Sequence, residues 1–314
     1  MNEVSAAPLL VPKVFRFTEV DTFRSSVRNL NVDFTPLLRT IAAEQTILHL
    51  PGCDVNYTRS FPRIIDSQLG PNATAVGFSM DDGEPIRFNG VERDRSAIVI
   101  GHSGAAYHAV ERTARKYASI IFTPEIEGRG WPQTDLNFKI FETSEAAQRA
   151  LRGLVLQVLS TASRMSDPFE VAVASAAIKE SLLAAIDNAF ANVVTAEWAS
   201  RANNTRQIKV FRDVQAVLSG DVGHPIYSGD IARQIGVSVR TLHDAVQRYR
   251  GMSLHRYLRL RRLWLVRQRL RAGTQSIKAC ALAFGFWHLG DFSRIYRSQF
   301  GESPSDTVAR SRES

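Results

Sequence analysis

The sequence predicts an α+β chain of two domains, a β-rich N-terminal domain followed by an all-α C-terminal domain. Short segments rich in β-forming residues alternate with turn signals over residues 46–126. The last third of the chain instead shows helical periodicity interrupted by single glycines. Charge divides the chain at the same place, because residues 206–314 hold 19 Lys and Arg against 8 Asp and Glu, whereas residues 1–205 hold 20 against 23. With 314 residues, each domain has enough chain to bury a core.

Five segments of the N-terminal domain have the composition of short strands, and turns such as Pro51-Gly52 and Asn89-Gly90 separate them. The predicted strands are residues 47–50, 75–80, 86–89, 97–100 and 117–122. Evenly spaced short strands favour a small antiparallel barrel or sandwich. We predict a β-barrel over about residues 46–126, within an N-terminal domain of residues 1–198.

A pair of helices is predicted at about residues 145–190, with a break at Asp167-Pro168. Its two apolar stripes are Ala147, Leu151, Leu154 and Val158, and then Val171, Ala174, Ile178, Leu182 and Ala185. Such stripes suit antiparallel packing and self-association. They equally suit helices that cover the barrel, so both interpretations stay open. Residues 199–207 are polar and aperiodic, which is typical of a linker.

The C-terminal domain, residues 208–314, begins with a helix–turn–helix pattern. Ser228 is the expected N-cap of the first helix, Gly236 supplies the turn, and Ser238 is the expected N-cap of the second helix. The apolar face of the second helix consists of Leu242, Ala245, Val246 and Tyr249.

A second helix–turn–helix pattern lies nearer the C-terminus. Gly285 is expected to end its first helix, because glycine tolerates the left-handed conformation of a C-terminal cap. The apolar face of the following helix consists of Phe292, Ile295, Tyr296 and Phe300. Residues 253–271 join the two patterns as a helix with two apolar faces, which predicts a rigid connector covered on both sides.

A short helix with an apolar back and a basic front is the build of a recognition helix for the major groove of DNA. We therefore predict two recognition helices, at about residues 239–250 and 290–299, that enter successive major grooves of double-stranded DNA. Of the 18 basic residues from Lys209 onward, 16 are Arg, which makes bidentate contacts with phosphate and guanine.

Residues 206–312 resemble the double helix-turn-helix domain of the AraC/XylS transcription regulators. The carrying residues are Ile231-Ala232, Gly236-Val237-Ser238, Arg240-Thr241-Leu242, Gly251, Tyr257-Leu258, Arg262-Leu263, Ala283-Phe284-Gly285-Phe286, Phe292-Ser293-Arg294, Phe300-Gly301 and Ser303-Pro304-Ser305. The turn at residues 285–290 is similar to that of the branch with the ethanolamine-operon regulators. The resemblance implies a ligand-responsive activator that works with RNA polymerase, a cupin-like effector domain, and a homodimer formed through the helical pair.

The exposed positions of the two predicted recognition helices are the candidate DNA contacts. They are Ser238, Arg240, His243, Asp244, Gln247 and Arg248 in the first helix, and Leu289, Gly290, Ser293, Arg294 and Arg297 in the second. Serine hydroxyls and helix N-termini are suited to phosphates, and the longer side chains to base edges or nearby phosphates. Asp244 departs from the family pattern, and Leu289 and Gly290 form few hydrogen bonds. The second helix is therefore expected to depend more on shape than on direct readout.

Five residues of the N-terminal domain are candidates for contact with a small-molecule effector, because they combine apolar surface with a polar group. They are Tyr57, His102, Tyr107, His108 and Trp131. Only Glu111 lies near the two histidines, so neither a metal nor another cofactor is expected. The alternative class is a cupin-type enzyme with a basic C-terminal domain, although the segment around Ser103 lacks the glycine spacing of a nucleophile elbow.

The remaining features predict a cytoplasmic protein with no membrane partner. Cys53 and Cys280 form neither a disulfide framework nor a zinc-ligand spacing, and Cys280 is expected in the core. The N-terminus lacks the basic and apolar regions of a secretory signal. No window of the sequence is apolar enough to cross a bilayer.

Overall fold

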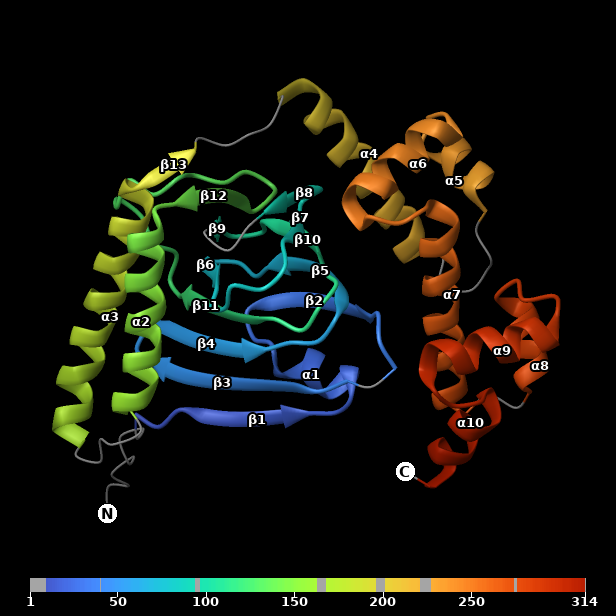
Figure 1. Ribbon diagram of the computed structural model, residues 1–314, viewed down its shortest axis with the longest axis horizontal. Coiled ribbons are helices and arrows are strands. Elements are labelled where there is room, and N and C mark those ends of the chain that lie inside the picture. The colour runs from blue at the N-terminus through green and yellow to red at the C-terminus, as the bar shows by residue number, and fades with distance from the viewer. Residues whose placement is uncertain are drawn as a thin grey trace, which may run out of the picture.

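The computed structural model describes residues 10–39, 41–93, 97–162, 168–195, 201–220, 227–273 and 276–313. In these ranges, two antiparallel sheets, one short helix and a pair of long helices form the N-terminal part, and helices alone form the C-terminal part (Figure 1). The predicted combination of a sheet domain with a helical C-terminal domain is therefore confirmed.

The larger sheet has eight strands in the order β1-β3-β4-β11-β6-β9-β12-β13. They are β1 (Lys13–Phe17), β3 (Ala43–Leu50), β4 (Cys53–Arg59), β11 (Lys116–Phe122), β6 (Thr74–Ser79), β9 (Ala97–Gly101), β12 (Lys139–Thr143) and β13 (Val193–Thr195). The smaller sheet has five strands in the order β2-β5-β10-β7-β8. They are β2 (Leu30–Pro36), β5 (Arg63–Leu69), β10 (Ala106–Glu111), β7 (Ile86–Phe88) and β8 (Val91–Arg93). Helix α1 (Val20–Ser26) connects β1 with β2.

The predicted closed barrel over residues 46–126 is wrong, because the strands form two separate sheets. Each sheet keeps two edge strands, β1 and β13 in the larger one and β2 and β8 in the smaller one. Consecutive strands β4, β5 and β6 alternate between the sheets, so the connections stack one sheet on the other and do not close either. The strands also extend beyond the predicted range, from Lys13 to Thr195.

All five strands predicted from the sequence are present, as β3, β6, β7, β9 and β11. Polar and charged residues interrupt the apolar ones along β4, β5 and β10, and the sequence analysis did not assign these segments as strands. The smaller sheet is built mainly from such strands, and its position could not be predicted.

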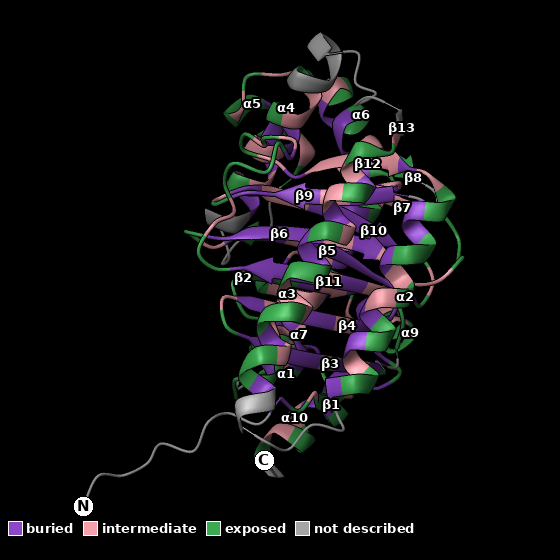
Figure 2. Cartoon of the chain, turned by 90° about the vertical axis from the view of Figure 1, so that its left-hand side faces the viewer, coloured by how far each residue is buried: buried purple, intermediate pink, exposed green. Residues whose placement is uncertain are grey.

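Helices α2 (Glu145–Ala162) and α3 (Pro168–Ala191) pack together on the outer face of the larger sheet (Figures 1 and 2). Side chains alternate between the two faces of the sheet. On β11, Ala118, Ile120 and Phe122 pack in the core beneath the helices. Tyr117, Ser119 and Ile121 lie between the two sheets. The helices therefore cover the sheet, which was one of the two interpretations left open.

The C-terminal part consists of seven helices within the described residues. They are α4 (Arg201–Gly220), α5 (Ser228–Gln234), α6 (Val239–Arg250), α7 (Leu254–Arg271), α8 (Ile277–Ala283), α9 (Leu289–Phe300) and α10 (Pro304–Glu313). The segment predicted as a linker, residues 199–207, is helical from Arg201 onward. Buried Phe211, Val214 and Leu218 on α4 account for this helix, because their spacing gives it one apolar face.

Helix α7 joins two small hydrophobic cores, as predicted for a rigid connector. Its first half contributes Leu254 and Leu258 to a core shared with α5 and α6. Its second half contributes Leu263 and Val266 to a core shared with α8 and α9. Cys280 lies in this second core, as predicted. Among the described residues, no helix is long and apolar enough to cross a membrane.

We expect Leu151→Ala to lower the free energy of unfolding by about 2–5 kcal/mol, because Leu151 is fully buried between α2 and the larger sheet. Urea denaturation followed by circular dichroism measures this change. Leu156→Ala is the matched control, since Leu156 lies on the same helix and is 53% exposed. Equal effects of the two substitutions would contradict the packing of α2 on the sheet.

Candidate DNA-binding surface

Helices α5 and α6 form the first helix–turn–helix unit. Its turn contains Gly236 at φ +68°, a left-handed conformation that favours glycine. The hydroxyl of Ser238 caps α6 and accepts a hydrogen bond from the backbone N–H of Thr241 at 3.1 Å. The predicted recognition helix of residues 239–250 coincides with α6. The predicted cap of α5 is wrong by one position, because Tyr227 lies at the N-cap and Ser228 is the first helical residue.

Helices α8 and α9 form the second helix–turn–helix unit. Gly285 lies in its turn at φ +76°. Phe292, Tyr296 and Phe300 are buried on one face of α9, with ring centroids 5.6 Å and 4.6 Å apart along the series. The helix is one residue longer at each end than the predicted range of residues 290–299. This packing fixes which face of α9 remains open to solvent.

Nine of the eleven candidate DNA contacts are exposed on the faces of α6 and α9 that point away from the cores. They are Ser238, Arg240, His243, Asp244, Gln247, Gly290, Ser293, Arg294 and Arg297. Leu289 is half-buried and packs against the core of the second unit. Arg248 is also half-buried and donates a hydrogen bond to the side chain of Gln207 at 2.9 Å. Contact of these residues with DNA stays a prediction.

Trp287 is a further candidate contact that the sequence analysis did not select. It lies in the turn directly before α9, and 64% of its surface is exposed. Its place in the turn that leads into α9, beside the exposed face of that helix, makes it a candidate contact. The sequence could have identified Trp287, because this residue lies between two amphipathic helices and belongs to the apolar stripe of neither.

The C-terminal domain contacts the smaller sheet through a buried ion pair. Arg250, the last residue of α6, is completely buried and donates to Asp66 Oδ1 at 2.5 Å. Asp66 Oδ1 also accepts hydrogen bonds from Gln215 Nε2 at 3.1 Å and from His108 Nδ1 at 2.6 Å. The guanidinium of Arg250 lies 4.6 Å from the ring centroid of Phe211, a cation–π distance. One carboxylate of the N-terminal domain thus anchors α4 and α6.

The pKa shifts of this cluster follow from burial and charge. Burial raises the pKa of Asp66, but the charge of Arg250 and the hydrogen bond from His108 outweigh this effect and hold the pKa well below its usual range. Burial lowers the pKa of His108, more strongly than the neighbouring Asp66 raises it, and the charges of Arg250 and Arg212 lower it further. His108 is therefore neutral at pH 7 and donates its Nδ1 proton to a charged Asp66.

The ends of both recognition helices are tied to the N-terminal domain. Arg87 of β7 donates to the backbone carbonyl of Arg248 at 2.7 Å, in the last turn of α6. Arg39 donates to the backbone carbonyl of Ser298 at 2.8 Å, in the last turn of α9. Gln299 donates in turn to the carbonyl of Pro36 at 3.4 Å. These contacts leave the first turns of α6 and α9 free of the N-terminal domain.

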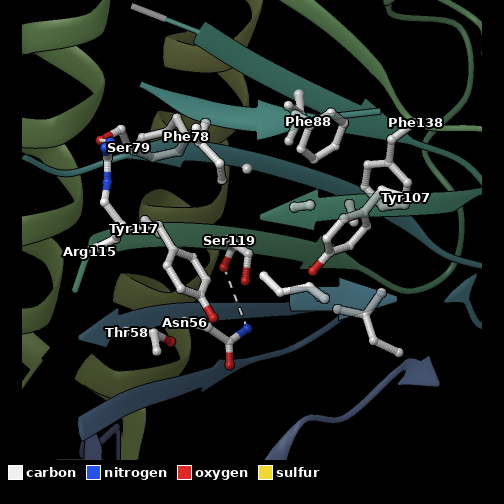
Figure 3. Close-up of a pocket in the computed structure, with 18 of the residues that line it drawn as sticks. Asn56, Thr58, Phe78, Ser79, Phe88, Tyr107, Arg115, Tyr117, Ser119 and Phe138 are labelled. Carbon is white, nitrogen blue, oxygen red and sulfur yellow. Dashed lines mark hydrogen bonds between the residues drawn. The ribbon is translucent and has the colours of Figure 1, made fainter. Parts of the chain in front are cut away.

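A cavity of about 140 Å³ lies between the two sheets, with Phe88, Tyr107 and Phe138 at one end and Phe78 and Tyr117 at the other (Figure 3). Of the five candidate effector contacts, Tyr107 alone lines it. His108 faces Asp66 on the outer side of the smaller sheet. The other three also lie away from the cavity. Tyr57 alternates along β4 with the lining residues Asn56 and Thr58, His102 contacts the Thr134 hydroxyl at 2.9 Å, and Trp131 Nε1 donates to Asp187 beside α3 at 2.7 Å.

The sequence analysis missed the polar residues that line this cavity, among them Thr58, Arg63 and Glu111. No local signal in β5 or β10 identified Arg63 and Glu111, because their partners lie in other strands. Within the part of the chain that the structure describes, no group of three or more His, Cys, Asp or Glu residues could hold a metal ion.

Comparison with known proteins concerns the C-terminal domain. Residues 231–310 match the family described as a helix-turn-helix domain. The XylDLEGF operon transcriptional activator 1 of Pseudomonas putida is 40% identical over 77 residues, which is 24% of this chain and 23% of that protein. The activator RhaS of Pectobacterium atrosepticum is 34% identical over 94 residues, which is 29% of this chain and 34% of that protein.

A solved transcriptional regulator of Chromobacterium violaceum, with an AraC-type DNA-binding domain, is 28% identical. The match covers 34% of this chain and 96% of that one, with a TM-score of 0.31. The chain thus spans about a quarter to a third of the length of the two activators it matches. Its C-terminal part is a helix-turn-helix domain similar to the corresponding domains of transcriptional activators.

We expect the free energy of unfolding to fall as the pH drops below about 6.5, the ordinary pKa of histidine, because the folded pKa of His108 lies lower and the unfolded chain binds the proton first. One such group contributes at most about 1.4 kcal/mol per pH unit. His108→Gln should reduce this slope between pH 7.5 and 5.5 in urea denaturation, and His255→Gln, at an exposed position on α7, should not. An unchanged slope in His108→Gln would contradict a neutral, buried His108.

Proposed function

We propose that the chain is a sequence-specific DNA-binding transcription regulator, an activator of the AraC/XylS family. The observation that carries the proposal is the pair of helix–turn–helix units joined by α7, each with a left-handed glycine in its turn and at least one exposed arginine on its second helix. Helices α6 and α9 would enter successive major grooves, about one helical turn or roughly 34 Å apart. Similarity to transcriptional activators over the same residues supports the activator role.

Several narrower assignments belong to the same proposal. The turn of residues 285–290 supports a place near the ethanolamine-operon regulators. An activator of this kind recruits RNA polymerase, which we propose as a partner. We place the protein in the cytoplasm, because a bacterial-type regulator acts where the chromosome lies. Its role is regulatory rather than catalytic, in keeping with the matched activators.

Response to a small molecule is supported by the two faces of the smaller sheet. On β5, Arg63 and Ile65 line the cavity, whereas Ile64 and Asp66 contact the C-terminal domain. On β10, the cavity-lining residues Tyr107, Ala109 and Glu111 alternate in the same way with His108 and Val110. A ligand in the cavity would therefore contact strands β5 and β10, whose opposite faces pack against α4, α6 and α7.

Homodimerisation through α2 and α3 is proposed from the character of their outer face. The exposed side of α3 is largely small and apolar, with Ala172, Ala176 and Ala177 beside Val173, which is 58% exposed. On α2, Leu156 is also exposed. A two-helix surface of this kind is suited to packing against a second copy of itself.

Selection of bound sequences from a random duplex pool at near-physiological salt tests the proposed function with the full chain. The expected result is an enriched bipartite motif with halves about ten base pairs apart. Repeated copies of this motif in one duplex would support the dimer. Binding without enrichment would leave only the salt-dependent attraction of a basic protein for DNA, and the proposal would fail.

Arg240→Ala should weaken binding to the selected sequence by about 1–3 kcal/mol and relax the choice of one or two bases, because Arg240 is exposed in the first turn of α6. Fluorescence anisotropy with the selected duplex and with single-base variants measures both effects. Arg149→Ala, at an exposed position on α2, is the control for the loss of one positive charge. Equal weakening on every duplex would reassign Arg240 to a phosphate contact.

A further inference from the structure

The cavity between the sheets has the size of a single substituted ring. Its volume is about 140 Å³, and an apolar protein cavity of about 150 Å³ is known to take up benzene. Aromatic rings surround one end, where Phe88 stacks on Tyr107 at 5.3 Å and Phe138 lies edge-on to Tyr107 at 5.1 Å (Figure 3). The lining also includes apolar side chains of both sheets, among them Ile65, Ala109 and Ile121.

A buried guanidinium provides the main polar group of the cavity. Arg63 is 1% exposed, its Nε donates to Glu111 Oε2 at 3.1 Å, and its Nη2 donates to the hydroxyl of Tyr117 at 3.1 Å. Its position is fixed further by the ring of Phe34, whose centroid lies 4.4 Å from Cζ. Nη1 is buried and has no acceptor among the described residues. A buried donor in a polar site normally has a partner.

A second unsatisfied group lies next to the first. Thr58 is completely buried, it lines the cavity, and its hydroxyl has no hydrogen-bond partner among the described residues. Thr58 pairs directly with Tyr117 across strands β4 and β11, and Figure 3 shows the two side chains close together. Tyr117 in turn accepts from Arg63. Arg63 and Thr58 thus each offer an unpaired donor beside Tyr117, and Nη1 of Arg115, which also lines the cavity, has no acceptor among the described residues either.

Each buried arginine of the cavity lining is already paired with a carboxylate, whereas Arg28 and Lys116 of the lining are exposed to solvent. Glu111 is 4% exposed and pairs with Arg63, and Arg115, the other buried arginine of the lining, pairs with Asp81 at 3.3 Å. A second anion beside Glu111 would repel it in a medium of low dielectric constant. An acceptor without charge satisfies Nη1 of Arg63 and the Thr58 hydroxyl without this repulsion.

We propose that the cavity binds a small uncharged aromatic compound that carries a carbonyl group. The carbonyl oxygen accepts from Nη1 of Arg63, with the Thr58 hydroxyl as a second donor, and the ring lies among the apolar side chains of the two sheets. This ligand class rests on the proposed function, because it identifies the chemistry of the effector site of that regulator.

Calorimetric titration of the full chain with four matched probes tests the proposal. Acetophenone is the uncharged carbonyl probe, α-methylstyrene replaces its oxygen with CH₂, benzamide is a second uncharged carbonyl, and benzoate adds a negative charge. We expect acetophenone and benzamide to bind about tenfold tighter than α-methylstyrene, because the hydrocarbon leaves both donors unpaired. Benzoate should bind more weakly than either carbonyl probe.

Two variants locate the binding. Thr58→Val keeps the shape of the side chain and should reduce the preference for acetophenone over α-methylstyrene, whereas Thr46→Val should not, since Thr46 on β3 does not line the cavity. Ala109→Leu fills the cavity beside Ile65 and should abolish binding of all four probes. The circular dichroism spectrum and the melting temperature of each variant show whether it has folded.

Three results would overturn the proposal. If benzoate bound most tightly, the site would be assigned to an anion. If α-methylstyrene and acetophenone bound equally, the polar cluster would have no role in binding. If none of the probes bound, an aromatic ligand would be rejected. In each case, enrichment of a DNA motif in the duplex selection would leave the regulator assignment intact. Loss of that enrichment, with probe binding preserved, would reject the regulator and retain the cavity chemistry.

Discussion

The ion pair between Arg250 and Asp66 determines how the two domains are arranged. Arg250 is completely buried at the end of α6, yet its carboxylate partner belongs to β5 of the other domain. A buried guanidinium that loses its partner is strongly destabilising, because its charge remains out of water. Rings of Phe211 and Tyr257 lie 4.6 Å and 5.0 Å from its Cζ and restrict its position. The contact with the smaller sheet therefore fixes the orientation of α6 relative to the N-terminal domain, whereas its packing on α4, α5 and α7 fixes it within the C-terminal domain.

The smaller sheet separates the cavity from the C-terminal domain, and different side chains lie on its two faces. Successive side chains of a strand point to opposite sides, so Arg63 faces the cavity only three residues before Asp66 faces α6. On β10, His108 and Ala109 are similarly divided. Protein interiors are densely packed and transmit small displacements. A change at Arg63 or Glu111 is therefore separated from the domain contact by a single backbone layer.

The helix–turn–helix units could be predicted almost to the residue, whereas the sheets could not. Recognition helix α6, its cap at Ser238 and its turn at Gly236 are specified by contacts within a few residues. Strands β5 and β10 pair over a separation of about 40 residues, as Asp66 does with His108, and their polar residues are explained only by partners elsewhere in the fold. The choice of effector candidates had the same weakness. Tyr107 and His108 were both selected by residue type, but as neighbours on β10 they lie on opposite faces of the sheet, and only Tyr107 lines the cavity.

The positions of the domain contacts bear on how such a protein can be regulated. Contacts to the N-terminal domain involve the last turns of both recognition helices, at Arg248 and Arg250 of α6 and at Ser298 of α9. The exposed first turns, which carry Arg240 and Ser293, are not covered by these contacts. Within the described ranges, these contacts of the N-terminal domain therefore leave open the face that we propose to bind DNA. Since α7 is a rigid connector packed in both units, a shift of the smaller sheet at α6 would carry α9 with it, and under the proposed function it would turn both helices together relative to DNA.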